Sequence, residues 1–160
     1  MKHIIVLFGP SGCGKFTVRE HLQEKRSVTR HIMKYRVLQY HSRENVEKMK
    51  SGSSLNGLDR AMWLCDLSSA ATAATSNHEV VGVFCSALKR NYRKLFRSTV
   101  AEYNKRIQKQ HEDVKIRLHF RFLQMSEEMA EMLVEQRQQR MGHYMPKSLV
   151  RSQFEILEIP

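Results

Sequence analysis

A glycine-rich run near the start of the chain has the residue types and spacing of a phosphate-binding loop. Residues 9–15 follow the pattern G-x-x-x-x-G-K. Glycines let successive backbone N–H groups turn toward one anion, and the lysine adds a mobile positive charge at the terminal phosphates. The candidate nucleotide-binding residues are Gly9, Pro10, Ser11, Gly12, Cys13, Gly14, Lys15 and Phe16.

The residue after the lysine departs from this pattern. A serine or threonine at that position ordinarily ligates the Mg²⁺ that bridges the phosphates, but the sequence has Phe16. Thr17 carries a hydroxyl one residue later, yet one helical step turns a side chain by about 100°, so we expect it to point elsewhere. We therefore predict a loop that holds phosphate better than metal, and we assign no metal-ligating residue.

The elements that must position this loop can be placed from hydrophobic patterning. Apolar runs predict strands over 4–8, 35–40, 80–85 and 114–125, and amphipathic patterns predict helices over 15–25, 42–50, 58–75, 86–99 and 129–140. In the last helix we expect Met129, Met132 and Leu133 to form the apolar face. We assign no element to residues 25–34, and we interpret 101–114 as an insertion-like segment. Strands alternating with helices predict an α/β fold with a mostly parallel sheet and helices on both faces.

Length and composition indicate an ordinary globular protein. The 160 residues suit one domain, and no apolar run approaches the roughly 20 residues that span a bilayer. Three widely spaced cysteines and the lack of a signal-peptide pattern predict a cytoplasmic protein. The net charge is +11, and residues 89–121 hold eleven Lys/Arg against three Asp/Glu, a net +8. Such a cluster favours polyanions, although we prefer a solvated helix face to nucleic-acid binding as its explanation.

Two further blocks, taken with the loop, resemble one family. Residues 41–64 read H-S-R-E-N-V-E-K-M-K-S-G-S-S-L-N-G-L-D-R-A-M-W-L, and residues 85–93 read C-S-A-L-K-R-N-Y-R. They are similar to the H-P-x-x-N-x-x-K-M-x-x-G-x-P-L-x-D-x-D-R-x-P-W-L and C-S-A-L-K-x-x-Y-R-D blocks of the gluconate kinases (gluconokinases), which are small P-loop kinases. The segments 140–145 and 152–158 continue the resemblance in family order along nearly the whole chain.

The resemblance implies a single P-loop kinase domain over residues 1–160, shorter at its C-terminus than the family by a last strand and helix. It also implies ATP-dependent phosphorylation of D-gluconate to 6-phospho-D-gluconate, with ATP and Mg²⁺ as cofactors and no membrane partner; a homodimer is left open. The implied catalytic residues are Lys15, Lys89, Arg93 and Arg140, the last on a lid over ATP. The implied gluconate-binding residues are His41, Asn45, Arg60, Lys89 and Arg93.

The departures from the family pattern leave an alternative open. Arg36 and Leu38 stand where the family has acidic residues that assist Mg²⁺ and the acceptor hydroxyl, and Gln136 stands where a lid arginine is expected, with Arg137 beside it. A leucine cannot accept a proton, and a basic residue cannot hold the metal. The alternative is a gluconokinase-like protein that binds nucleotide or phosphate without efficient turnover. A basic nucleic-acid-binding protein is a second alternative.

Overall fold

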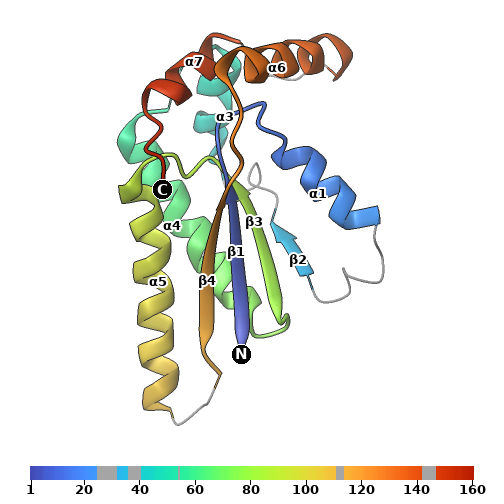
Figure 1. Ribbon diagram of the computed structural model, residues 1–160. Coiled ribbons are helices and arrows are strands. Elements are labelled where there is room, and N and C mark those ends of the chain that lie inside the picture. Colours follow the sequence, from blue (N-terminus) through green and yellow to red (C-terminus); the bar gives the residue numbers. More distant parts are fainter. Residues whose placement is uncertain (25–31, 36–40, 54, 111–113, 142–146) are drawn as a thin grey trace.

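The computed structural model of the protein describes residues 1–24, 32–35, 41–53, 55–110, 114–141 and 147–160 (Figure 1). In chain order the elements are β1 (Lys2–Phe8), α1 (Lys15–Glu24), β2 (Ile32–Tyr35), α3 (Arg43–Lys50), α4 (Gly57–Ala74), β3 (Val80–Cys85), α5 (Arg90–Lys109), β4 (Ile116–Phe122), α6 (Glu127–Met141) and α7 (Ser148–Glu155). Among these described segments, no helix combines the length and apolar character that crossing a bilayer requires.

The four strands form one parallel sheet in the order β2-β3-β1-β4. The apolar runs predicted over 4–8 and 80–85 form the two central strands, as continuous apolar runs do when both faces of a strand are covered. Phe8 lies opposite Cys85 on β3 and opposite Phe122 on β4. The carboxyl ends of these three strands therefore meet at one edge of the sheet.

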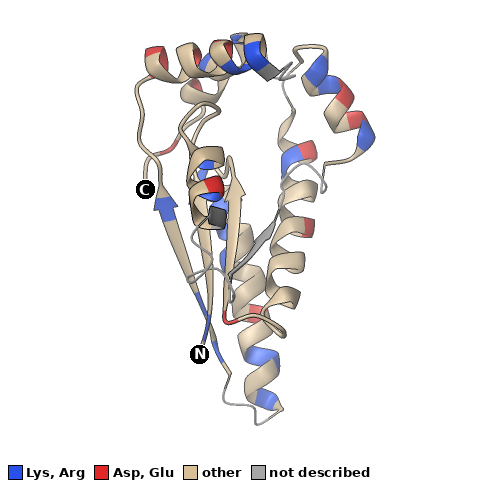
Figure 2. Ribbon diagram, turned by 90° about the vertical axis from the view of Figure 1, so that its right-hand side faces the viewer, with Lys and Arg blue, Asp and Glu red and all other residues tan. Residues whose placement is uncertain are grey.

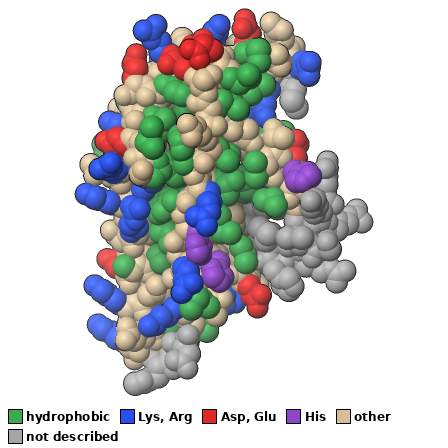
Figure 3. Space-filling view, in the orientation of Figure 1, with side chains coloured by type: hydrophobic (Ala, Val, Ile, Leu, Met, Phe, Trp, Pro, Cys, Tyr) green, Lys and Arg blue, Asp and Glu red, His purple; other side chains and the backbone are tan. Residues whose placement is uncertain are grey.

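Helices lie on both sides of this sheet, as the patterning predicted. Figures 1 and 2 show the long helices α4 and α5 together on one face, where Ile4, Val6, Val83 and Phe96 belong to the main core. Phe84 points to the opposite face from Val83 and is also buried, because α1 packs against β3 on that side. On the same face, Figure 3 shows histidine, basic and hydrophobic side chains along the strands.

A second, smaller core lies beyond the carboxyl ends of the strands, where α6 and α7 pack together (Figure 1). Its buried members are Met49, Leu55, Ala130, Val134, Leu149 and Val150. The expected apolar face of α6 was therefore wrong in part: Met129 and Met132 are 45% and 43% exposed. The small Ala130 faces the interior, which lets α6 approach the rest of the molecule closely.

Other predictions also need correction. Helix α5 continues to Lys109, through the segment interpreted as an insertion, because Val100 and Ile107, seven residues apart, are both buried on one side of it. Strand β2 starts at Ile32, in a stretch that was given no element, and most of the strand predicted over 35–40 lies outside the described residues. Helix α7 was not predicted.

Candidate functional site

The glycine-rich loop joins β1 to α1 at the carboxyl edge of the sheet, in the strand–loop–helix context that its pattern requires. Gly12 and Gly14 have φ angles of 87° and 90°, a conformation that other residues adopt only with strain. A Cβ atom on Gly12 would lie 2.4 Å from the carbonyl oxygen of Ala130 in α6. The glycine spacing therefore serves both the turn and the close approach of α6.

Lys15 folds back into this loop. Its Nζ donates hydrogen bonds to the carbonyl oxygens of Gly9 at 2.6 Å and Pro10 at 2.7 Å, and lies 3.4 Å from the Sγ of Cys13. Burial lowers the pKa of the Lys15 amine from its ordinary value. The loop thus holds a positive charge at its centre with few polar partners other than its own backbone.

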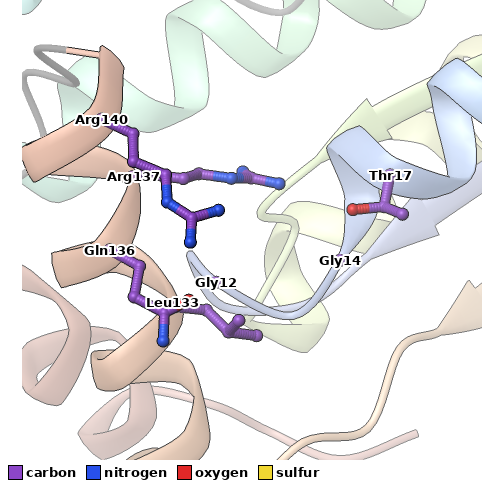
Figure 4. Close-up of a pocket in the computed structure, with 7 residues that line it drawn as sticks. All are labelled: Gly12, Gly14, Thr17, Leu133, Gln136, Arg137 and Arg140. Carbon is purple, nitrogen blue, oxygen red and sulfur yellow. The ribbon is translucent and has the colours of Figure 1, made fainter.

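A pocket of about 190 Å³ separates the loop from α6. Figure 4 shows Arg137 and Arg140 extending from α6 toward the loop, with Thr17 on the other side. Arg140, which the family resemblance predicts to lie on a lid, is one of the residues that line this pocket. Thr17, which we expected to point away from the ligand position of the loop, is one of the residues that line this pocket.

Phe16 does not line this pocket but contacts two arginines beside it. The guanidinium carbon of Arg19 lies 4.5 Å from the centre of the Phe16 ring, and that of Arg137 lies 5.0 Å from it. Both distances are those of cation–π contacts. Phe16 therefore links the start of α1 to the arginine that extends from α6.

The segment after β3 lies next to the loop, because β1 and β3 are paired in parallel and end together. Burial raises the pKa of the Cys85 thiol at this end to about 12. Lys89 follows at the start of α5, and within the described part of the chain its partly exposed side chain forms no hydrogen bond or ion pair. Within the described residues, the Lys89 amine therefore has no polar partner that would compete with a ligand.

Arg93 has a different environment from the one expected of a substrate contact. It is 2% exposed, and its guanidinium donates to the carbonyl oxygens of Ala87 and Leu88, both at 2.9 Å, and of Glu158 at 2.8 Å. It also lies over the Phe8 ring, 4.9 Å from its centre. In this conformation Arg93 supports the segment that carries Lys89, and it does not extend toward a ligand.

The block from residue 41 to residue 64 brings together a histidine and a tryptophan. The rings of His41 and Trp63 stack with centres 4.3 Å apart and planes 15° from parallel. His41 Nδ1 and Trp63 Nε1 are both buried without a hydrogen-bond partner among the described residues. Burial lowers the pKa of His41 to about 4, so the ring is neutral at pH 7.

The other expected acceptor residues lie on the helices around this pair. Asn45 is buried on α3, and its backbone N–H donates a hydrogen bond to the hydroxyl oxygen of Ser42, the N-cap of that helix. Arg60 lies three residues before Trp63 on α4, so the two share a side of that helix. A 2.9 Å ion pair from Lys48 to Asp59 joins α3 to α4, and a capping box between Asn56 and Asp59 begins α4.

Comparison with known proteins agrees with this arrangement. No protein-family model matches the chain. It is 34% identical over 157 residues to a probable gluconokinase of Xenopus tropicalis, covering 98% of this chain and 79% of the relative. It is also 34% identical to the thermoresistant gluconokinase of Escherichia coli, covering 99% and 78%. A crystal structure of a gluconokinase from Sinorhizobium meliloti superposes with a TM-score of 0.69 at 34% identity, covering 99% of this chain and 76% of that one.

The chain belongs to the gluconokinase family. Its parallel sheet and helices are those of the P-loop kinases that this family exemplifies. Kinases of this kind transfer phosphate with Mg²⁺ bridging the phosphate oxygens, so a metal site would be expected beside the loop.

The residues of this gluconokinase-family chain fit such a metal ion poorly, because the Thr17 hydroxyl lines the pocket without any carboxylate beside it among the described residues. Phe16 occupies the ligand position with an aromatic ring between side chains that carry positive charge. No cluster of three or more His, Cys, Asp or Glu side chains suited to a metal occurs among the described residues. Arg36 and Leu38 lie outside those residues, but neither residue type is a metal ligand.

Sequence reasoning missed two residues that support the glycine-rich loop and the start of α5. The Ser11 N–H donates to Gln153 Oε1 of α7 at 2.7 Å. The Glu158 carboxylate accepts from the backbone N–H of Arg90 and so caps α5. Both residues lie in the 152–158 segment that supported the family resemblance, and that was the signal available. Their partners are more than sixty residues away, so no local pattern could reveal them.

Proposed function

We propose that this protein phosphorylates D-gluconate at its 6-hydroxyl with ATP. The observation that carries the proposal is the common edge of β1 and β3, which puts the glycine-rich loop beside the Lys89 segment. Two groups of residues suited to anions thus lie at the carboxyl ends of adjacent parallel strands, where ligands of such sheets bind. One group suits the phosphates of a nucleotide, and the other suits an acceptor.

The nucleotide end would use the loop, Lys15 and Arg140. Backbone N–H groups at the start of α1 favour negative charge. The Lys15 amine exchanges its bonds to the Gly9 and Pro10 carbonyls for bonds to phosphate oxygens. Arg140, on the opposite wall of the pocket, adds charge from α6. Because the cavity of about 190 Å³ is small, it suits a chain of phosphates better than a whole nucleotide.

The acceptor end would use the pair formed by His41 and Trp63. Two buried ring nitrogens without partners represent an unmet hydrogen-bonding demand, and a polyhydroxy acid can satisfy both. A neutral imidazole can donate or accept, which suits a hydroxyl group. Arg60 and Lys89 supply positive charge for the carboxylate of gluconate, and Asn45 supplies an amide.

The chemistry is in-line attack of the 6-hydroxyl oxygen on the γ-phosphorus of ATP, with ADP leaving. Such transfer depends mainly on positioning and on charge stabilisation. Lys15, Lys89 and Arg140 would stabilise the charge on the transferred group. We assign Arg93 a positioning role through its three carbonyl contacts; direct contact with the acceptor would require it to give these up.

The test is a coupled assay for 6-phosphogluconate with saturating ATP, with and without Mg²⁺. We expect turnover that falls at least about 100-fold in Lys15→Ala, because that variant loses a charge aimed at the reacting phosphates. Lys94→Ala removes the same charge from an exposed position on α5 and should keep full activity. Wild-type turnover no higher than that of Lys15→Ala would refute the proposal.

One observation favours a second candidate, a protein that binds nucleotide without efficient turnover. Phe16 removes a hydroxyl that other members of the P-loop group use for the metal. This candidate predicts ATP binding by calorimetry together with no 6-phosphogluconate formation. Restoring the hydroxyl in Phe16→Ser should then raise turnover.

A further inference from the structure

Positive charge is concentrated where a metal ion would otherwise lie. Arg19 and Arg137 both contact the ring of Phe16, at 4.5 and 5.0 Å. Arg137 also lines the pocket, together with Arg140, and lowers the pKa of Lys15 as the least of several contributions. No carboxylate lines the pocket among the described residues. A divalent cation entering here would meet two guanidinium groups, with the neutral Thr17 hydroxyl and Gln136 amide as the oxygen-bearing side chains of the lining.

A phosphate chain entering the same pocket meets the opposite situation. Guanidinium groups bind phosphate oxygens with paired, charge-assisted hydrogen bonds. Figure 4 shows Arg137 and Arg140 directed at the loop from one side, with the loop backbone on the other. The phosphates would therefore be neutralised from both sides by groups of the protein itself.

The ring of Phe16 lies against the Arg137 guanidinium and so affects how this group meets phosphate oxygens. A guanidinium over an aromatic face keeps its N–H groups in the plane of the ion free for other partners. Among the described residues no carboxylate pairs with Arg137: the acidic residues of α6 that form ion pairs, Glu131 and Glu135, pair with Lys147. The ring that displaces the metal ligand thus also orients a positive charge toward the phosphates.

We propose that this site binds the phosphates of its nucleotide as the metal-free anion, with Arg137, oriented by Phe16, in place of the divalent ion. The inference rests on the proposed nucleotide site, but it does not require that gluconate be phosphorylated. It concerns which form of the nucleotide, free or metal-bound, the loop selects.

Calorimetric titration tests the proposal with ATP and with inorganic triphosphate, each in EDTA and in excess MgCl₂. Wild-type protein should bind both probes in EDTA, and MgCl₂ should weaken the binding at least threefold because it removes the free anion. Arg137→Gln should lose at least tenfold in affinity in EDTA. Arg97→Gln removes the same charge from a guanidinium that lies 4.8 Å from the ring of Phe120, away from the pocket, and should change nothing.

Variants of the ring separate the orientation of Arg137 from folding. Phe16→Leu keeps apolar volume but has no aromatic face, and it should lose affinity in EDTA while its thermal unfolding stays near that of wild type. Phe16→Ser should become magnesium-dependent. An unfolded Phe16→Ser protein would leave Phe16→Leu and Arg137→Gln to decide the outcome.

Two results would overturn the proposal. The first is wild-type binding that is at least tenfold tighter with MgCl₂; loss of that gain in Thr17→Val would assign the metal to the Thr17 hydroxyl. The second is no binding of either probe in any medium, which would also remove the nucleotide site itself. Metal-free binding without gluconate phosphorylation would refute the proposed function alone and support this inference.

Discussion

Lowering the pH should destabilise this protein through His41. The folded state holds the pKa of His41 at about 4, whereas an unfolded histidine titrates near 6.5. Between these values the unfolded chain binds a proton that the folded chain does not, so the free energy of unfolding falls as the pH falls from about 6.5 to about 4. The contribution of neutral His41 to the free energy of unfolding is fully present above pH 6.5.

The size of the effect follows from the two pKa values. At pH 5 the linkage relation gives a loss of about 2 kcal/mol. Because His41 is only partly buried, solvent screening reduces the loss, and we expect about 1 kcal/mol. The perturbation is His41→Phe, which keeps an aromatic ring stacked on Trp63 and cannot titrate.

The assay is urea unfolding of both proteins at pH 7 and pH 5. Carboxylates titrate in both proteins alike, so the change with pH in the difference between the two free energies isolates His41. We expect that difference to shift by about 1 kcal/mol in favour of His41→Phe at pH 5. An unchanged difference, or an NMR titration of His41 centred near 6.5, would refute the reasoning.

Three further predictions concern the loop and its supports. Gly12→Ala and Gly14→Ala should both strain the backbone by about 1–3 kcal/mol, but only Gly12→Ala should also displace α6 and lower ATP affinity in calorimetry, since a Cβ on Gly14 meets no atom within 4 Å. Arg93→Met should lower the free energy of unfolding in urea by about 2–4 kcal/mol, because it leaves buried carbonyl groups unpaired; an unaltered midpoint would contradict this structural role. Glu158→Ala should cost about 1 kcal/mol in thermal unfolding by uncapping α5, and equal melting curves would show that the cap is unimportant.

Features with a strong local signal were predictable from the sequence. The apolar runs over 4–8 and 80–85 correctly located β1 and β3. The glycine spacing located the turn in which Gly12 and Gly14 have positive φ angles. Ser42 was also predictable as the N-cap of α3, because a serine just before a helix accepts a hydrogen bond from a backbone N–H of the first turn. In each case the physical cause lies within a few residues of the feature.

Features that depend on distant contacts were not predictable. Arg93 in its motif looks like a ligand of an anion, but the carbonyl that it binds at Glu158 is 65 residues away. The apolar side of α6 was misassigned because methionine outranks Ala130 in hydrophobicity, while the close packing against Gly12 requires a small residue. Hydrophobic patterning ranks residues by type only, and it contains no information on how much space a distant neighbour leaves for a side chain.

Within the described part of the chain, strand β4 pairs with β1 on one side and lies at the edge of the sheet on the other, and the side chain of Asn104 completes both backbone hydrogen bonds of Ile116. Beyond Ile116, the exposed charges of Arg117 and Arg121 stand along the strand. Exposed strand edges template pairing with other chains, and basic side chains oppose it. Salt that screens these two arginines should therefore weaken their opposition to edge-to-edge association, so we expect the protein to associate more readily at high ionic strength than in dilute buffer.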